Sequence, residues 1–425
     1  MRLRMDGSRN FVALVMSLVA LKFLLATVTP YGYDFVLYLS AVLADDKTIS
    51  WSPWIILVRG IFYFWLWLPI HQNDILPLRA AMLASKPGFL MPTHYLLTML
   101  VKTPLILADL ATGFLVYKLG TNLSGSQKTG RRAALLWLAN PFATFFVEMW
   151  GTIDIIIIML SLVSIVYLLK NRTRLSALAL LSAVAIRLSP ILTWLSLTSW
   201  LVGGKSDWRK TLLIVLSGPL GLAAYLYWSS QAQFFSNFVS FMSSTGLFSN
   251  YTPVTLPFSE YTSSELYQLY LTPGFAVIAV VTYYLIAREV FRKDDWTLIA
   301  MTLSGILLVY GFADWFPTAF LWAMPLLAIF NSKEGEYRYS AGLYGILTIY
   351  LIIFYSLQLA SSGVHVLFIP VNLVPFGRIL TSGIAFANVL RQLSGLDFQT
   401  RSVLAGVSIA YSMSITWKIL MKRRK

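Results

Sequence analysis

The sequence has no cysteine and only three histidines, His71, His94 and His365, among its 425 residues. The lack of cysteine excludes disulfides, thiolate nucleophiles and thiol-based redox chemistry. The three histidines are far apart along the chain and do not show the paired spacing of a zinc site. A zinc site is therefore not expected, and we expect no cofactor.

Charged residues are also scarce, at 12% of the sequence, against about 25% in an ordinary soluble domain. Hydrophobic residues make up 57%, and they form recurring apolar runs. Runs of about 20 residues are long enough to cross a hydrocarbon core of about 30 Å as helices. This pattern predicts an all-α, multi-pass integral membrane protein with about 10–12 membrane helices, in contact with the lipid bilayer.

The basic residues outnumber the acidic ones by 33 to 18, which gives a net charge of +15. They gather in short loops between apolar runs, as the positive-inside rule describes, so the charge predicts membrane orientation and no nucleic-acid partner. On this basis both termini are cytoplasmic. Residues 51–70 contain Arg59 and many aromatic rings. A span there would place the basic loop 118–132 outside, so an interfacial helix is favoured over a true span.

Two charges occur inside the predicted span from about Thr93 to Tyr117. Lys102 and Asp109 are seven residues apart, or about two helical turns, so they share one face without touching directly. A membrane helix with both charges must turn that face to protein or water. The following two spans are predicted to turn on the outer side near Glu148 to Asp154.

Residues 175–202 carry Arg187 and Pro190 in the middle of one apolar stretch, with basic loops at both ends. Proline removes a backbone donor, and two basic flanks favour the same side of the membrane. The sequence AIRLSP therefore predicts the apex of a broken helix pair. One long tilted span is the alternative.

The stretch YGYDFVLY after the first apolar run carries Asp34 out of the lipid, with Tyr38 one helical turn further on. A carboxylate just outside the hydrocarbon is suited to accept a proton from a hydroxyl group. An acid at the start of a helix also serves as an N-cap. Both roles are compatible with this position.

Six stretches occur in a characteristic order along the chain: YGYDFVLY, KTPLILADLATGFLVYKLG, RRAALLWLANPF, MWGTID, AIRLSP and DWFPTAFLWAMPLLA. In this order and membrane placement the chain resembles the GT-C class of membrane glycosyltransferases, nearest the catalytic subunit of GPI mannosyltransferase I and its archaeal and bacterial relatives. The resemblance implies a GT-C fold with a catalytic outer-loop region. It divides the chain into a GT-C-like module, residues 1–230 with a first outer loop at 30–92, and C-terminal membrane helices, residues 231–425 with an outer loop at 230–270.

The resemblance also implies roles for single residues. Position 32 is glycine and position 36 is valine, so the chain lacks the second acid of a DxD-like pattern, which favours a metal-free site. Arg187 has a competing role as a structural ion-pair partner of an intramembrane acid. The implied roles are catalysis for Asp34, acceptor binding or orientation of the base for Tyr38 and Asp154, donor-phosphate binding for Arg187 and Lys102, and donor or sugar contact for Trp315 and Phe316.

The expected activity is inverting transfer of a sugar, mannose in the family resembled, from a polyprenyl (dolichyl) phosphate donor. The acceptor is a hydroxyl of a glycan or glycolipid at the outer or lumenal membrane face. A membrane transporter or lipid flippase with a buried charged pathway is the alternative, and a noncatalytic subunit of a glycosylation complex is a third. Acids and aromatic residues gathered in outer loops favour the one-sided enzyme, since alternating access places its site at the midplane between related halves.

Overall fold

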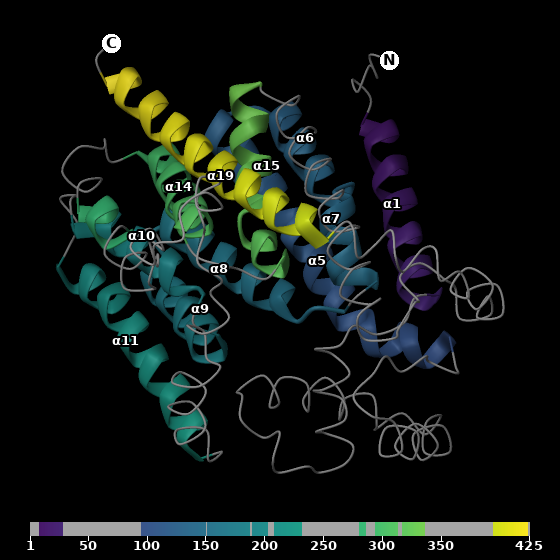
Figure 1. The fold of residues 1–425 in the computed structure, drawn as a ribbon, viewed down its shortest axis with the longest axis horizontal. Helices are drawn as coiled ribbons and strands as arrows, with labels where there is room; N and C mark the ends of the chain where they lie inside the picture. The colour runs from purple at the N-terminus through teal and green to yellow at the C-terminus, as the bar shows by residue number, and fades with distance from the viewer. Residues whose placement is uncertain are drawn as a thin grey trace. The chain divides into compact units, whose positions relative to one another are not determined.

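A computed structural model describes most of the predicted helical core, and every element in the described part is helical (Figure 1). The all-α prediction is confirmed for the described residues, and the GT-C type stays a prediction. Three of these helices are long and apolar enough to cross a membrane, at Arg9–Thr27, Lys102–Ser124 and Trp208–Tyr227. The described residues are 8–28, 95–149, 151–187, 189–202, 208–231, 280–285, 294–312, 317–335 and 394–423.

The chain divides into two compact units. The first unit comprises Met1–Met159 and Asn331–Asp397, and the second comprises Leu160–Phe330 and Phe398–Lys425. The predicted domain division near residue 230 stays a prediction.

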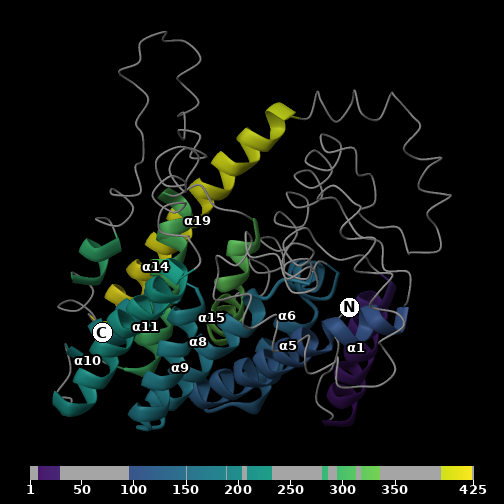
Figure 2. The ribbon, with the colours of Figure 1, turned by 90° about the horizontal axis from the view of Figure 1, so that it is seen from below.

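The first unit is built around two long helices and a series of short ones. Helix α1 packs against α5, and α5 packs against α6, so the three lie side by side in both ribbon views (Figure 2). Its elements are α1 (Ser8–Val28), α5 (Tyr95–Ser124), α6 (Gln127–Leu138), α7 (Pro141–Thr144), the π-helix η1 (Phe145–Met149) and the start of α8 (Asp154–Leu169).

Local sequence explains the sharp turns of this unit. Gly125, with a φ of 66°, follows the end of α5 in the left-handed conformation that glycine adopts at low cost. The side chain of Asn140 accepts a hydrogen bond from the Phe142 amide at 3.0 Å, and Pro141 takes the first helical position. Asparagine caps and a following proline both favour the start of a helix, so α7 begins directly after α6 ends.

Helix α5 has two distinct faces. Lys102 and Asp109 are completely buried, whereas Leu107 and Phe114 are more than half exposed on other faces of the same helix. The prediction that the two charges turn together toward protein is confirmed. The exposed apolar residues suit the lipid-facing side of a membrane helix.

The second unit contains the remaining helices. Helix α9 packs against α11, and α10 packs against both α11 and α14. Gly221 of α11 permits the first of these contacts, because an added Cβ would lie 2.8 Å from Val184 Cβ and 2.9 Å from the Leu181 carbonyl oxygen. The elements are α8 from residue 160, α9 (Thr173–Ile186), α10 (Ile191–Val202), α11 (Trp208–Gln231), the helical residues 280–285, α14 (Asp295–Phe312), the 3₁₀ helix η5 (Pro317–Trp322), α15 (Met324–Glu334) to residue 330 and α19 (Ser394–Arg423) from residue 398.

Helices α9 and α10 are interrupted at AIRLSP, where the sequence predicts a break, and the prediction that both basic flanks lie on the same side of the membrane stays a prediction. Helix α9 ends at Ile186, Arg187 is extended with φ −151° and ψ 150°, and α10 starts at Ile191. Pro190 provides the physical reason, since proline lacks an amide proton and disfavours helical geometry in the residue before it.

A second proline, Pro219, lies inside α11 without ending it. Because proline has no amide proton, the Val215 carbonyl four residues earlier loses its helical donor. The indole Nε1 of Trp194 donates to this carbonyl at 3.2 Å and to the Ile214 carbonyl at 2.9 Å. The tryptophan of α10 thus supplies the missing donor and joins the two helices.

Candidate functional site

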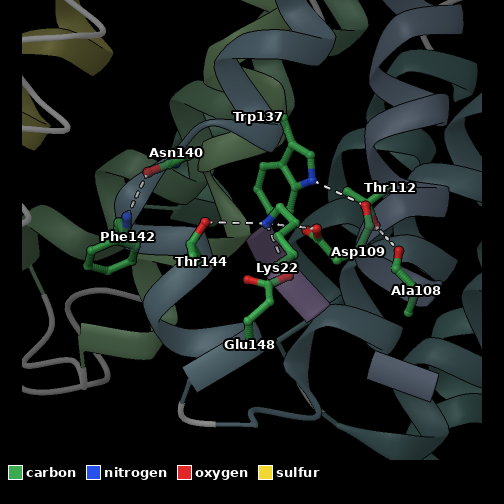
Figure 3. Close-up of polar contacts among 9 residues, drawn as sticks. All are labelled: Lys22, Ala108, Asp109, Thr112, Trp137, Asn140, Phe142, Thr144 and Glu148. Carbon is green, nitrogen blue, oxygen red and sulfur yellow. Dashed lines mark hydrogen bonds and ion pairs between the residues drawn. The ribbon is translucent and has the colours of Figure 1, made fainter. Parts of the chain in front are cut away.

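A buried charge cluster lies in the first unit, formed by Lys22, Lys102, Asp109 and Glu148. Figure 3 shows Lys22 between the carboxylates of Asp109 and Glu148. At its centre, Lys22 Nζ lies 3.0 Å from Asp109 Oδ2 and 3.0 Å from Glu148 Oε1. It also donates to Thr144 Oγ1 at 3.3 Å. The ammonium therefore has three oxygen neighbours, which matches its three N–H donors.

The second lysine approaches Glu148 from α5. Lys102 Nζ donates to the Glu148 backbone carbonyl at 3.0 Å. Glu148 belongs to η1, a single π-helical turn, and such turns are frequent at functional sites. Glu148 is thus held by Lys22 at its carboxylate and by Lys102 at its carbonyl.

The cluster contains two lysines and two carboxylates, so its formal charges cancel. This balance matters because all four side chains are at most 2% exposed, and a buried charge is costly unless it is paired. The backbone carbonyl of Asp109 accepts a further hydrogen bond from Trp137 Nε1 at 3.3 Å. Within the described residues, Asp109 Oδ1 and Glu148 Oε2 are buried and accept no hydrogen bond.

The turn after η1 leads directly to Asp154. Gly151 has a φ of 79°, in the left-handed region that favours glycine. The Thr152 amide donates to the Phe146 carbonyl at 2.8 Å, across the turn. Asp154 is the first residue of α8, where a negative charge is favoured by the helix dipole, and it is 1% exposed.

The structure places the predicted site residues in different parts of the chain. Lys102 and Asp154 belong to the first unit, and Arg187 belongs to the second. Arg187 is partly buried in the extended segment between α9 and α10. Asp34, Tyr38, Trp315 and Phe316 lie outside the described residues, so their predicted roles stay predictions.

Two members of the charge cluster received no role from the sequence. Lys22 is the one charge in the apolar run from Phe11 to Val28, which was a signal that it needs a partner in the membrane. Glu148 was predicted only as part of an outer turn, whereas the structure buries it completely. Its partners come from α1 and α5, which are distant in sequence.

The described residues contain no group of three or more histidine, cysteine or acidic side chains suited to a metal ion. In the charge cluster, one oxygen of each carboxylate is engaged by Lys22. The arrangement therefore holds the π turn at Glu148 through charged contacts.

Comparison with known proteins identifies no family. No protein-family model matches the chain, and no curated protein matches it significantly.

Proposed function

We propose that the protein is an inverting glycosyltransferase that moves a sugar, mannose in the first instance, from a polyprenyl phosphate to a glycan or glycolipid hydroxyl. The observation that carries this proposal is Arg187 at the non-helical break between α9 and α10. Irregular backbone is tolerated at membrane depth only where it is buried in protein or lines a cavity. A guanidinium at such a break is suited to bind a lipid phosphate through two hydrogen bonds.

In the proposed reaction, Asp34 accepts the proton of the acceptor hydroxyl, and the hydroxyl oxygen attacks the anomeric carbon. The bond from that carbon to the lipid phosphate oxygen breaks, and the phosphate leaves with the electron pair. A cation at the phosphate stabilises the charge that develops there, which is the role of Arg187. Lys102, which is buried and bound to the Glu148 carbonyl, holds the turn before Asp154 instead. Tyr38 and Asp154 orient the acceptor or the base, and Trp315 and Phe316 contact the donor.

The proposal is tested by incubating the purified protein with labelled dolichyl-phosphate mannose and a panel of octyl glycosides as acceptors. Asp34→Asn keeps the side-chain size but cannot act as a base, so turnover falls by about 10² to 10⁴ while donor binding is unchanged. Asp45→Asn, in the same stretch, is the matched control and keeps full turnover. Wild-type turnover in Asp34→Asn would remove Asp34 from the mechanism.

The donor site has its own test. Arg187→Ala weakens donor binding by roughly ten- to a hundredfold, because a charge-assisted contact contributes about 1.5 to 3 kcal/mol. The exposed Arg174 of α9 provides the control, and Arg174→Ala binds donor normally. Unfolding of Arg187→Ala with normal donor affinity in the folded fraction would make Arg187 a structural ion-pair partner.

Orientation is testable because the natural sequence has no cysteine. Single cysteines at residues 34, 128 and 425 are expected to react with a membrane-impermeant reagent from outside only at residue 34. This is the result for cytoplasmic termini and an outer or lumenal active site. Labelling at residue 128 would mean that residues 51–70 cross the membrane.

A transporter or flippase is the second candidate, favoured by the charge cluster buried among helices. Lys22 is paired with both carboxylates and Lys102 is bound to a backbone carbonyl, which suits a fixed structure better than an open pathway. Vesicles that contain the purified protein distinguish the two: the enzyme transfers label to the octyl glycoside, whereas a flippase moves the labelled lipid across the bilayer without transfer.

A further inference from the structure

The charge cluster concentrates two independent contacts on one short turn. Lys22 from α1 binds the side chain of Glu148, and Lys102 from α5 binds its backbone carbonyl. Helices α1 and α5 also pack directly against each other and against η1. The π-helical turn is therefore anchored from both long helices of the first unit at the same residue.

This anchored turn is connected to Asp154 by a very short segment. Asp154 follows Glu148 by six positions, and the segment between them contains the left-handed Gly151 and the hydrogen bond from Thr152 to Phe146. The hydrogen bond from Thr152 to Phe146 joins the residues just before α8 to the π turn that contains Glu148.

We propose that Glu148 is a positioning residue, which holds Asp154 in place for the acceptor through the turn between them. This inference rests on the proposed function, because it uses the acceptor role of Asp154. It adds Lys22 and Glu148 to the residues on which the acceptor site depends. Neither residue touches the reacting atoms in this scheme.

Burying four charges in one cluster is costly. Well-packed apolar residues join helices at least as stably as a buried ion pair, so stability alone does not favour four buried charges. Ion pairs have a fixed donor and acceptor geometry, which apolar contacts lack. Carboxylate and carbonyl of one residue, both bound, fix the position and the rotation of the π turn.

The first measurement is hydrogen–deuterium exchange of the full-length protein in detergent. Glu148→Gln keeps the side-chain shape but removes its charge, which weakens the contact with Lys22. Peptides covering residues 146–154 are expected to exchange about tenfold faster in this variant, in proportion to the lost charge-assisted hydrogen bond. Peptides of α9, residues 173–186, keep the wild-type rate.

The second measurement is the kinetics of sugar transfer from dolichyl-phosphate mannose to the best octyl glycoside. Glu148→Gln raises the KM for the octyl glycoside by about tenfold and changes the KM for the donor less than twofold. Ser176→Ala, which removes a buried hydroxyl in the second unit, is the control. It is expected to lower thermal stability without changing either KM or the exchange of residues 146–154.

The outcomes separate the two proposals. Unchanged exchange of residues 146–154 in both Glu148→Gln and Lys22→Met overturns the positioning role, as does faster exchange with an unchanged acceptor KM in an active enzyme. If the wild-type protein transfers no label, the proposed function fails. Hydrogen–deuterium exchange then tests by itself whether Glu148 anchors the turn, and faster exchange of residues 146–154 supports this independently of the reaction.

Discussion

The two units of the protein join their helices by different chemistry. In the first unit, among the described residues, charged contacts between helices converge on the cluster around Lys22. In the second unit, the described contacts include hydrogen bonds of hydroxyl and indole groups, distributed over several helix pairs. One chain therefore holds its helices together in two ways, in an environment where the hydrophobic effect between helices is weak.

Two serine pairs illustrate the solution in the second unit. Ser164 Oγ donates to the Ser176 carbonyl at 3.0 Å, and Ser176 Oγ donates to the Ser164 carbonyl at 2.8 Å. Ser304 of α14 and Ser412 of α19 repeat this reciprocal arrangement, with their hydroxyl oxygens 2.6 Å apart. Both pairs allow close approach of the helix backbones, because serine is small.

The consequence is a difference in how each unit tolerates change. A buried charge that loses its partner leaves the opposite charge unpaired, so the cost is large and concentrated at one position. A lost hydroxyl contact between membrane helices costs little, because alternative partners exist. The following four predictions compare the units, with stability measured as thermal unfolding in detergent.

The largest loss of stability is expected for Lys22→Met. This change leaves Asp109 and Glu148 buried with only Lys102 as a cation, and removing one partner of a buried pair costs about 3 to 5 kcal/mol. Leu21→Met, at a neighbouring position that is 47% exposed, is the control and unfolds like the wild type. A small loss of stability in Lys22→Met would mean that the charge cluster contributes little to the stability of the first unit.

A smaller loss is expected for Gly221→Ala in the second unit. The added methyl group collides with Val184 Cβ and the Leu181 carbonyl, and overpacking costs about 1 to 3 kcal/mol. Gly406→Ala in α19 is the matched control, since a Cβ there meets no atom within 4 Å. The control should be neutral or more stable, because alanine favours a helix over glycine. Equal behaviour of the two variants would show that α9 and α11 are not in tight contact.

The third change, Ser176→Ala, tests the distributed contacts. It removes the reciprocal bonds with Ser164, and the expected loss is about 0.6 to 1.7 kcal/mol, as for other hydrogen bonds between membrane helices. The control is Ser17→Ala, because the exposed Ser17 hydroxyl donates only to the Ala13 carbonyl of its own helix and does not join two helices. A loss of stability as large as that of Lys22→Met would mean that the two units do not differ in this respect.

The smallest net change is expected for the double variant Lys22→Met with Asp109→Leu. It leaves Lys102 and Glu148, so the remaining charges balance again. Replacing both partners of a buried pair by apolar residues is often nearly neutral, and the double variant should recover most of the stability that Lys22→Met loses. Additive losses in the two single variants and the double variant would contradict direct pairing of Lys22 with Asp109.

The features that were predicted from the sequence are local. The shared burial of Lys102 and Asp109 follows from helical periodicity, and the break that begins at Arg187 follows from Pro190. The partners of Glu148 could not be predicted in the same way, because Lys22 lies 126 residues away and reaches it only through tertiary packing. The π-helical form of η1 depends on those same contacts. The periodicity of the sequence therefore does not predict the π-helical form.

The place of Lys22 in α1 also has a consequence for the order of membrane insertion. Asp109 follows Lys22 by 87 residues, so at about 5 to 20 residues per second the ribosome makes the lysine several seconds before its first counter-charge. A lysine in the middle of a membrane helix opposes insertion by about 2.5 to 3.5 kcal/mol. We therefore expect the nascent α1 to remain near the insertion machinery or the membrane surface until α5 emerges, so that the two helices enter the bilayer as a neutralised pair.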